Sequence, residues 1–277
     1  MPVFSIKKMY DSKASAIPEV QRIENRRGIV CKFYNGPIQF DLTEVSDLCS
    51  SFYQLETYYK YISNDLRKEI QMKTVSHNIP TDEEIVNLMY DTISCMAYLQ
   101  SHNISHGCLL PELVLKDKKN YKIIEQISNH LAPGETNLYD LRNLNIEKDN
   151  CYLSPEGFRV YSKFNTLGAG KPPRMRAVDT VRNDVFVLGL ILLEYGVLQS
   201  VQKCFDWVNC EFEVRHLEHL MRLLEKNYPE NTLLTSTVKK MLSIDVETRP
   251  DFSMIYQRLP EYESVKGFFQ KQNQDRN

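Results

Sequence analysis

The residues best suited to chemistry lie in segment 105–115, which reads Ser-His-Gly-Cys-Leu-Leu-Pro-Glu-Leu-Val-Leu. His106 and Cys108 stand two residues apart, and a histidine beside a cysteine can take the thiol proton and leave a nucleophilic thiolate. The competing interpretation makes Cys108 an inert side chain that fills space like a small apolar residue. We adopt the second interpretation.

Two other motifs invite a chemical interpretation. Segment 168–172 reads Gly-Ala-Gly-Lys-Pro and has the composition of a phosphate-binding loop, but Pro172 stands where that motif needs serine or threonine. His216 and His219 lie three residues apart on a helix expected over 211–226, without a cysteine or carboxylate set to complete a metal site. We therefore predict a loop at 168–172, two solvated histidines and no metal site.

A helix must deliver the chain to segment 105–115. Thr81 and Glu84 form a capping box, and apolar residues then recur at 85, 88, 89, 93, 96 and 99 until about His102. Strands are expected over 3–8, 27–34, 52–60 and 121–128, and helices over 17–23, 64–70 and 183–194, while segment 35–50 is either a hairpin or an insert.

In this order, the segments resemble the protein-kinase family. Segment 105–115 is similar to the catalytic loop H-R-D-L-K-P-x-N, and segment 183–194 to the start of the buried large-lobe helix, D-V-W-S-L-G-x-x-L-x-E. Segment 152–158 resembles the A-P-E motif, and segment 241–250 the M-L-x-x-D-P-x-x-R-P ending of the large lobe. The polar stretch 129–152 stands where an activation segment would lie.

The resemblance implies an α+β, protein-kinase-like two-lobed fold with a reduced β-rich N-lobe and a mainly helical C-lobe. Residues 1–59 would form the N-lobe, with the family's third strand, αC helix, fourth strand and fifth strand. Residues 60–262 would form the C-lobe, and residues 263–277 a polar tail.

The chain departs from the family where the chemistry is done. The catalytic aspartate is replaced by Cys108, the loop lysine by Leu110, the metal-binding asparagine by Leu113, and the D-F-G aspartate by Glu125. Glutamate can bind Mg²⁺, but its extra methylene moves the carboxylate away from a rigid octahedral site. Phosphotransfer activity would then need replacement carboxylates from the polar segment 129–152. We therefore expect no catalytic residues and no metal.

Nucleotide binding would depend on Lys7 and Glu19. The resemblance places the phosphate-holding lysine–glutamate ion pair at these residues; the alternative is two solvated charges at a strand end and on a helix. The family's Gly-rich loop would precede Val3, so either the N-lobe is reduced or the chain is truncated. Extending the reading frame upstream would decide, because a truncated kinase should show a G-x-G-x-x-G motif there.

Four residues are expected to hold the fold rather than to catalyse. Asp184 would accept backbone N–H bonds from the loop around His106, and Glu156 would pair with Arg249 to pin segment 152–158 to the large lobe.

The composition limits the partners. There are 34 basic and 36 acidic residues, a net charge of −2, so no basic field favours nucleic acid or an anionic membrane. The seven cysteines form no C-x-x-C pair, and no signal peptide or membrane-length apolar run is evident, which together predict a cytoplasmic protein.

The sequence predicts a catalytically inactive kinase-like domain, a pseudokinase, without a cofactor. It would act by binding a protein partner, such as an active kinase, as a scaffold or allosteric partner. The alternative is a divergent Ser/Thr kinase, N-terminally truncated, that uses ATP and Mg²⁺. A third hypothesis is nucleotide binding without metal through Lys7 and Glu19.

Overall fold

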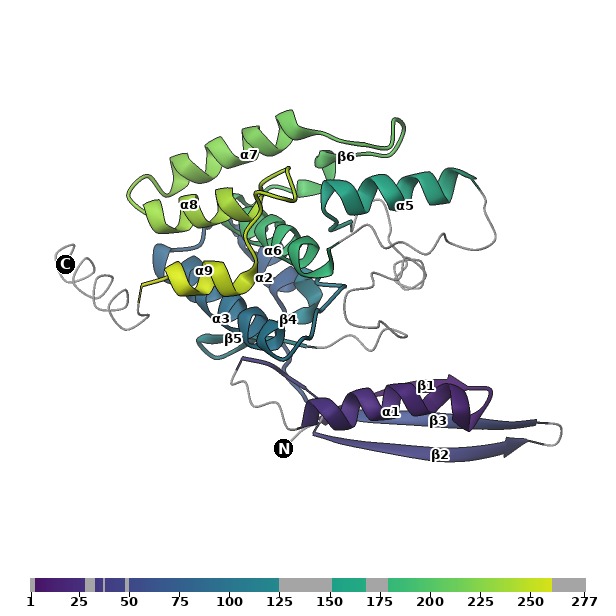
Figure 1. The fold of residues 1–277 in the computed structure, drawn as a ribbon. Helices are drawn as coiled ribbons and strands as arrows, with labels where there is room; N and C mark the ends of the chain where they lie inside the picture. The colour runs from purple at the N-terminus through teal and green to yellow at the C-terminus, as the bar shows by residue number, and fades with distance from the viewer. Residues whose placement is uncertain are drawn as a thin grey trace.

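The computed structural model describes residues 3–27, 33–36, 38–47, 50–124, 151–167 and 179–260. Its elements, in chain order, are β1 (Val3–Tyr10), α1 (Lys13–Arg27), β2 (Gln39–Asp47), β3 (Ser50–Lys60), α2 (Leu66–Ser76), α3 (Asp82–Ser101), η1 (Pro111–Leu113), β4 (Val114–Asp117), β5 (Asn120–Ile123), α5 (Pro155–Leu167), α6 (Thr180–Val197), η2 (Val201–Cys204), β6 (Phe205–Asp206), β7 (Glu211–Phe212), α7 (Val214–Asn227), α8 (Thr232–Met241) and α9 (Phe252–Arg258). This mixed structure of helices and small sheets is compatible with the predicted kinase-like α+β class (Figure 1).

The first sheet has the strand order β1-β3-β2 and is antiparallel throughout. Because side chains alternate along a strand, Tyr10, Leu55 and Leu42 share one face of the sheet. Helix α1 covers this face and buries Ala16 and Ile23 against it. The sheet and α1 thus form a small core of their own (Figure 1).

Two predictions in this region are corrected. The helix expected over 17–23 begins four residues earlier, because the Ser12 hydroxyl accepts a hydrogen bond from the Ser15 amide at 3.2 Å and caps the helix start. The strand expected over 27–34 is wrong in its described part. Arg27 ends α1, and Phe33 packs into the main core beside a single bridge from Tyr34 to Ile123.

Segment 35–50, which the sequence left open, contains strand β2. Its residues pair with β3 from Gln39 to Asp47, and Phe40 and Leu42 pack in the α1 core. The predicted domain boundary at 59/60 falls at the end of β3, and residues 263–277 lie outside the described residues.

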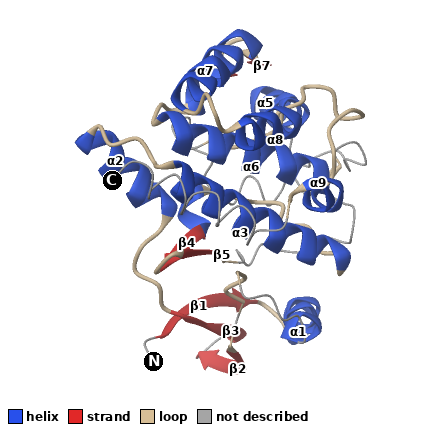
Figure 2. Cartoon of the chain, turned by 90° about the vertical axis from the view of Figure 1, so that its left-hand side faces the viewer, coloured by secondary structure: helices blue, strands red, loops and turns tan. Residues whose placement is uncertain are grey.

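The β4–β5 hairpin lies between the first sheet and α3 (Figure 2). Leu115 and Ile124 pack there against Tyr59 and Ile6. A backbone hydrogen bond also ties the hairpin to the chain between β3 and α2, since the Lys116 amide donates to the carbonyl of Asn64 at 2.9 Å. Apolar side chains of the described residues therefore pack between the first sheet and the hairpin.

Helix α3 confirms the predicted capping box. The Glu84 amide donates to the Thr81 hydroxyl at 3.2 Å, and the Thr81 amide donates to the Glu84 carboxylate at 2.9 Å. The helix predicted over 64–70 is also present as α2, where the Asp65 carboxylate accepts from the Lys68 amide.

Helix α6 is the centre of the helical part and is buried on almost all sides. Gly196 allows the close approach of its neighbours, because an added Cβ would lie 2.5 Å from Leu224 Cδ1 and 2.7 Å from Ile85 Cδ1. Helices α7 and α8 cover one side of α6, and α9 packs on α3 (Figure 1). Within the described ranges, no helix combines the length and apolar character that crossing a membrane requires.

Candidate functional site

The loop at His106 is bound to helix α6 through Asp184. The amide of His106 donates to the Asp184 carboxylate at 2.8 Å, and the amide of Gly107 donates to both its oxygens, at 3.0 and 3.1 Å. Gly107 has a φ of 75°, a conformation that glycine adopts without strain. The predicted contact between Asp184 and this loop is present.

Asp184 is almost completely buried, with 1% of its surface exposed. Burial raises the pKa of its carboxyl to about 7, although the hydrogen bonds from Gly107 and His106 act to lower it. The carboxyl therefore serves as a backbone acceptor inside the protein, without access to solvent.

The His106 ring is turned toward the backbone. Its Nε2 lies 3.0 Å from the carbonyl oxygen of Ile124, at the end of β5. Cys108 is buried, with 8% of its surface exposed. A reactive cysteine needs access to its substrate, so this burial supports the interpretation of Cys108 as an inert side chain.

Leu110 and Leu113 are also engaged in packing. Leu110 is half-buried against the main core, and Leu113 is half-buried in the cluster of Tyr59, Leu115 and Ile124 that joins the first sheet to the hairpin. The loop thus presents no charged group at the positions of Cys108, Leu110 and Leu113.

Glu156 and Arg249 form the predicted ion pair, with two hydrogen bonds of 2.6 and 3.2 Å. Arg249 is 1% exposed, and its remaining donors reach the carbonyl oxygens of Ser243, Arg182 and Ile244. Because every side of the guanidinium has an acceptor, the buried charge is compensated.

A network that sequence reasoning missed lies beside the loop. Arg67 donates to Glu112 at 3.0 Å, to Glu194 at 2.8 Å and to the Tyr152 hydroxyl at 2.7 Å. The Tyr152 hydroxyl donates in turn to Glu194 at 2.7 Å. Burial acts to lower the pKa of Arg67, but Tyr152, Glu194 and Glu112 outweigh it and raise the pKa above its ordinary value.

A second buried network follows along the hairpin. Glu69 of α2 accepts from Lys116 at 2.6 Å and from the Tyr195 hydroxyl at 2.8 Å. Burial and the neighbouring Glu69 raise the pKa of Tyr121 to about 12. No sequence signal identifies these networks, because their members come from α2, η1, β4, β5, α6 and the segment before α5.

Lys7 lies away from α1. It pairs with Glu56 of β3, Nζ to Oε2, at 3.2 Å, and its side chain is 58% exposed. The register places Lys7 on the sheet face opposite to Tyr10, which packs against α1, while Lys8 has the register position opposite Leu55. Glu19 belongs to α1, and its side chain lies outside the description. The structure does not bring Lys7 to the face that α1 covers.

The remaining predicted positions are Glu125, segment 168–172 and the two histidines of α7. Glu125 and segment 168–172 lie outside the described residues. The rings of His216 and His219 have centroids 6.1 Å apart, and among described residues no group of three or more potential ligands could hold a metal ion.

Comparison with known proteins finds a distant relative. The chain is 23% identical over 235 residues to a protein of Acanthamoeba polyphaga mimivirus whose name assigns it provisionally to the serine/threonine-protein kinases; the match covers 80% of this chain and 72% of the relative. No family model matches the chain. The similarity supports a kinase-like family for this protein and no finer assignment.

Proposed function

We propose that this chain is a catalytically inactive protein-kinase-like domain, a pseudokinase, that acts by binding another protein. The observation that carries the proposal is the packing of the loop around Cys108, Leu110 and Leu113. Phosphoryl transfer needs a base, a cation and a metal ligand at these places. Apolar side chains supply none of these three groups, and each is worth orders of magnitude in rate.

The same proposal includes a two-lobed arrangement, with an N-lobe over 1–59 and a C-lobe over 60–262, in a cytoplasmic protein. The separate core of the first sheet and α1 supports this division. The well-compensated Glu156–Arg249 pair and the Asp184 contacts support a domain whose fold is stabilised independently of catalysis. The protein would then serve as a scaffold, or as an allosteric partner of an active kinase.

The test is phosphotransfer by the purified full chain. We expect no incorporation of labelled phosphate into the chain or a general protein substrate with Mg²⁺ and ATP, and no heat of ATP binding by titration calorimetry with Mg²⁺ or with chelator. A preparation from the empty expression vector controls for contaminating kinases. Robust transfer that exceeds this control would overturn the proposal.

The alternative is a divergent Ser/Thr kinase, which the name of the mimivirus relative favours. Transfer that requires Mg²⁺ would identify this activity. ATP binding that persists with chelator, without transfer, would instead identify nucleotide binding that needs no metal.

A further inference from the structure

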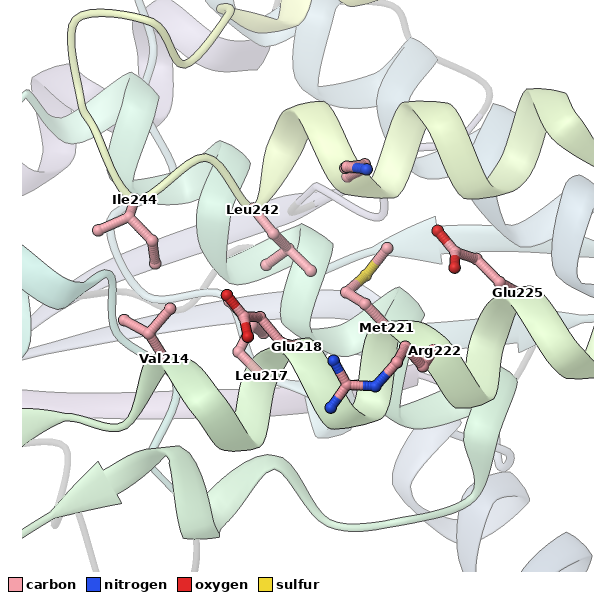
Figure 3. A pocket seen from close by; sticks show the side chains of 9 residues that line it. Val214, Leu217, Glu218, Met221, Arg222, Glu225, Leu242 and Ile244 are labelled. Carbon is pink, nitrogen blue, oxygen red and sulfur yellow. The ribbon is translucent and has the colours of Figure 1, made fainter.

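An apolar groove runs along α7 where the helix meets α8 and the loop that follows it. Leu217 and Leu242 form its floor and are 4% and 5% exposed, and Met221 beside them is half-buried. Val214 and Ile244 stand at one end and are 37% and 39% exposed (Figure 3). The cavity measures about 340 Å³, enough for a small number of apolar side chains.

The groove exists because the apolar stripe of α7 is wider than the surface of the neighbouring helices that packs on it. Leu220 and Leu224 are completely buried, whereas the stripe continues through Met221 to the open end at Val214. Exposed apolar surface of this kind, with a flexible methionine in it, is typical of surfaces that bind other proteins.

Charged side chains line the rim. Glu218, Arg222 and Glu225 follow one another along α7 at four- and three-residue steps, which places them along one side of the groove (Figure 3). Lys239 lines the groove from α8. Among described residues, none of the four forms an ion pair within 4 Å. Charges of both signs are therefore available to a partner.

The backbone around the groove limits what can bind. Most of the lining residues belong to α7 and α8, whose amides and carbonyls are used within the helices. An extended peptide would find no open strand edge here, whereas a helix needs only an apolar stripe and matched flanking charges.

We propose that this groove binds one amphipathic helix of a partner protein. The helix would place apolar side chains on Leu217, Met221 and Leu242, a lysine or arginine beside Glu218 and Glu225, and carboxylates beside Arg222 and Lys239. The inference rests on the proposed function in protein binding and names the surface that performs it.

The experiment uses the full chain and two labelled, stapled helices of about four turns. Both helices carry the same leucine stripe; one carries lysines toward Glu218 and Glu225, and the other carries glutamates there. By fluorescence anisotropy, we expect the lysine helix to bind about tenfold more tightly. The double variant Glu218→Lys/Glu225→Lys should reverse this order.

Ile244→Glu should weaken the lysine helix at least about tenfold, because it places a charge at the apolar end. Met254→Glu is the matched control, since Met254 is 45% exposed on α9 and outside the lining. Equal binding of both helices, or binding that Ile244→Glu leaves unchanged, would overturn the inference.

Other occupants would also overturn the inference. Self-association in sedimentation that Ile244→Glu abolishes would assign the groove to a second copy. Tighter helix binding after removal of residues 261–277 would assign it to the chain's own end. Phosphotransfer activity would defeat the proposed function and leave the anisotropy result unchanged, so the two failures are distinguishable.

Discussion

The carboxylate of Asp184 and the backbone amide of His106 are joined by a hydrogen bond of 2.8 Å, although 78 residues separate them in the sequence. The bond ties the second turn of α6 to the loop that leads toward β4. It fixes the loop that carries Cys108, Leu110 and Leu113 to the buried helix α6.

The burial of Asp184 predicts a pH dependence of the protein's stability. The folded pKa of Asp184, about 7, lies above its ordinary value of 3.8, so its contribution to the free energy of unfolding is complete below about pH 4 and is lost as the pH rises through 7. The loss approaches about 4 kcal/mol, since one pKa unit corresponds to about 1.36 kcal/mol. Urea denaturation across this range measures it.

Asp184→Asn is the control for that experiment, because it removes the titrating group and retains the side-chain shape. The free energy of unfolding of the wild type, relative to that of the variant, should fall as the pH rises from about 4 to 7. A difference that is constant over this range would show that Asp184 does not titrate there.

Glu156→Gln should destabilise the protein by about 3 kcal/mol, because it leaves the Arg249 guanidinium buried without a counter-charge. Lys7→Gln breaks an ion pair with a side chain that is 58% exposed and should cost less than about 1 kcal/mol. Chemical denaturation of both variants provides the comparison. Equal losses would contradict the buried character of the Glu156–Arg249 pair.

Arg67→Met should destabilise the protein by about 3 kcal/mol, because it leaves Glu194 buried without its counter-charge. Glu194→Gln should cost less, because Arg67 keeps Glu112 at 3.0 Å. The double variant should lose much less than the two single losses combined, with a coupling of at least about 1 kcal/mol. A double-mutant cycle in urea measures this coupling, and additive losses would show that the two residues act independently.

Gly196→Ala should destabilise the protein by about 1–2 kcal/mol despite the better helix propensity of alanine. The added Cβ meets Leu224 and Ile85, which are completely buried and have little room to move. Thermal unfolding measures the effect. In a Leu224→Ala background, the loss should be smaller, because only the close contact with Ile85 remains, and an undiminished loss there would refute the steric explanation.

Local patterns in the sequence determined the elements that depend on neighbours along the chain. The capping box at Thr81 and Glu84 and the apolar periodicity after it were enough to predict α3, because both signals lie within a few turns. The Glu156–Arg249 pair was predictable only through the family resemblance, since 93 residues separate its members.

The tertiary structure decided what local pattern could not. Phe33 lies in an apolar segment that indicated a strand, but its side chain packs in the main core. Strand β2 lies in segment 35–50, for which the sequence allowed either a hairpin or an insert. The face on which Lys7 lies follows from strand register, because a shift of one residue turns every side chain to the other face. The Arg67 network and the α7–α8 groove depend on helices brought together by packing, and only the folded chain places their side chains within reach of one another.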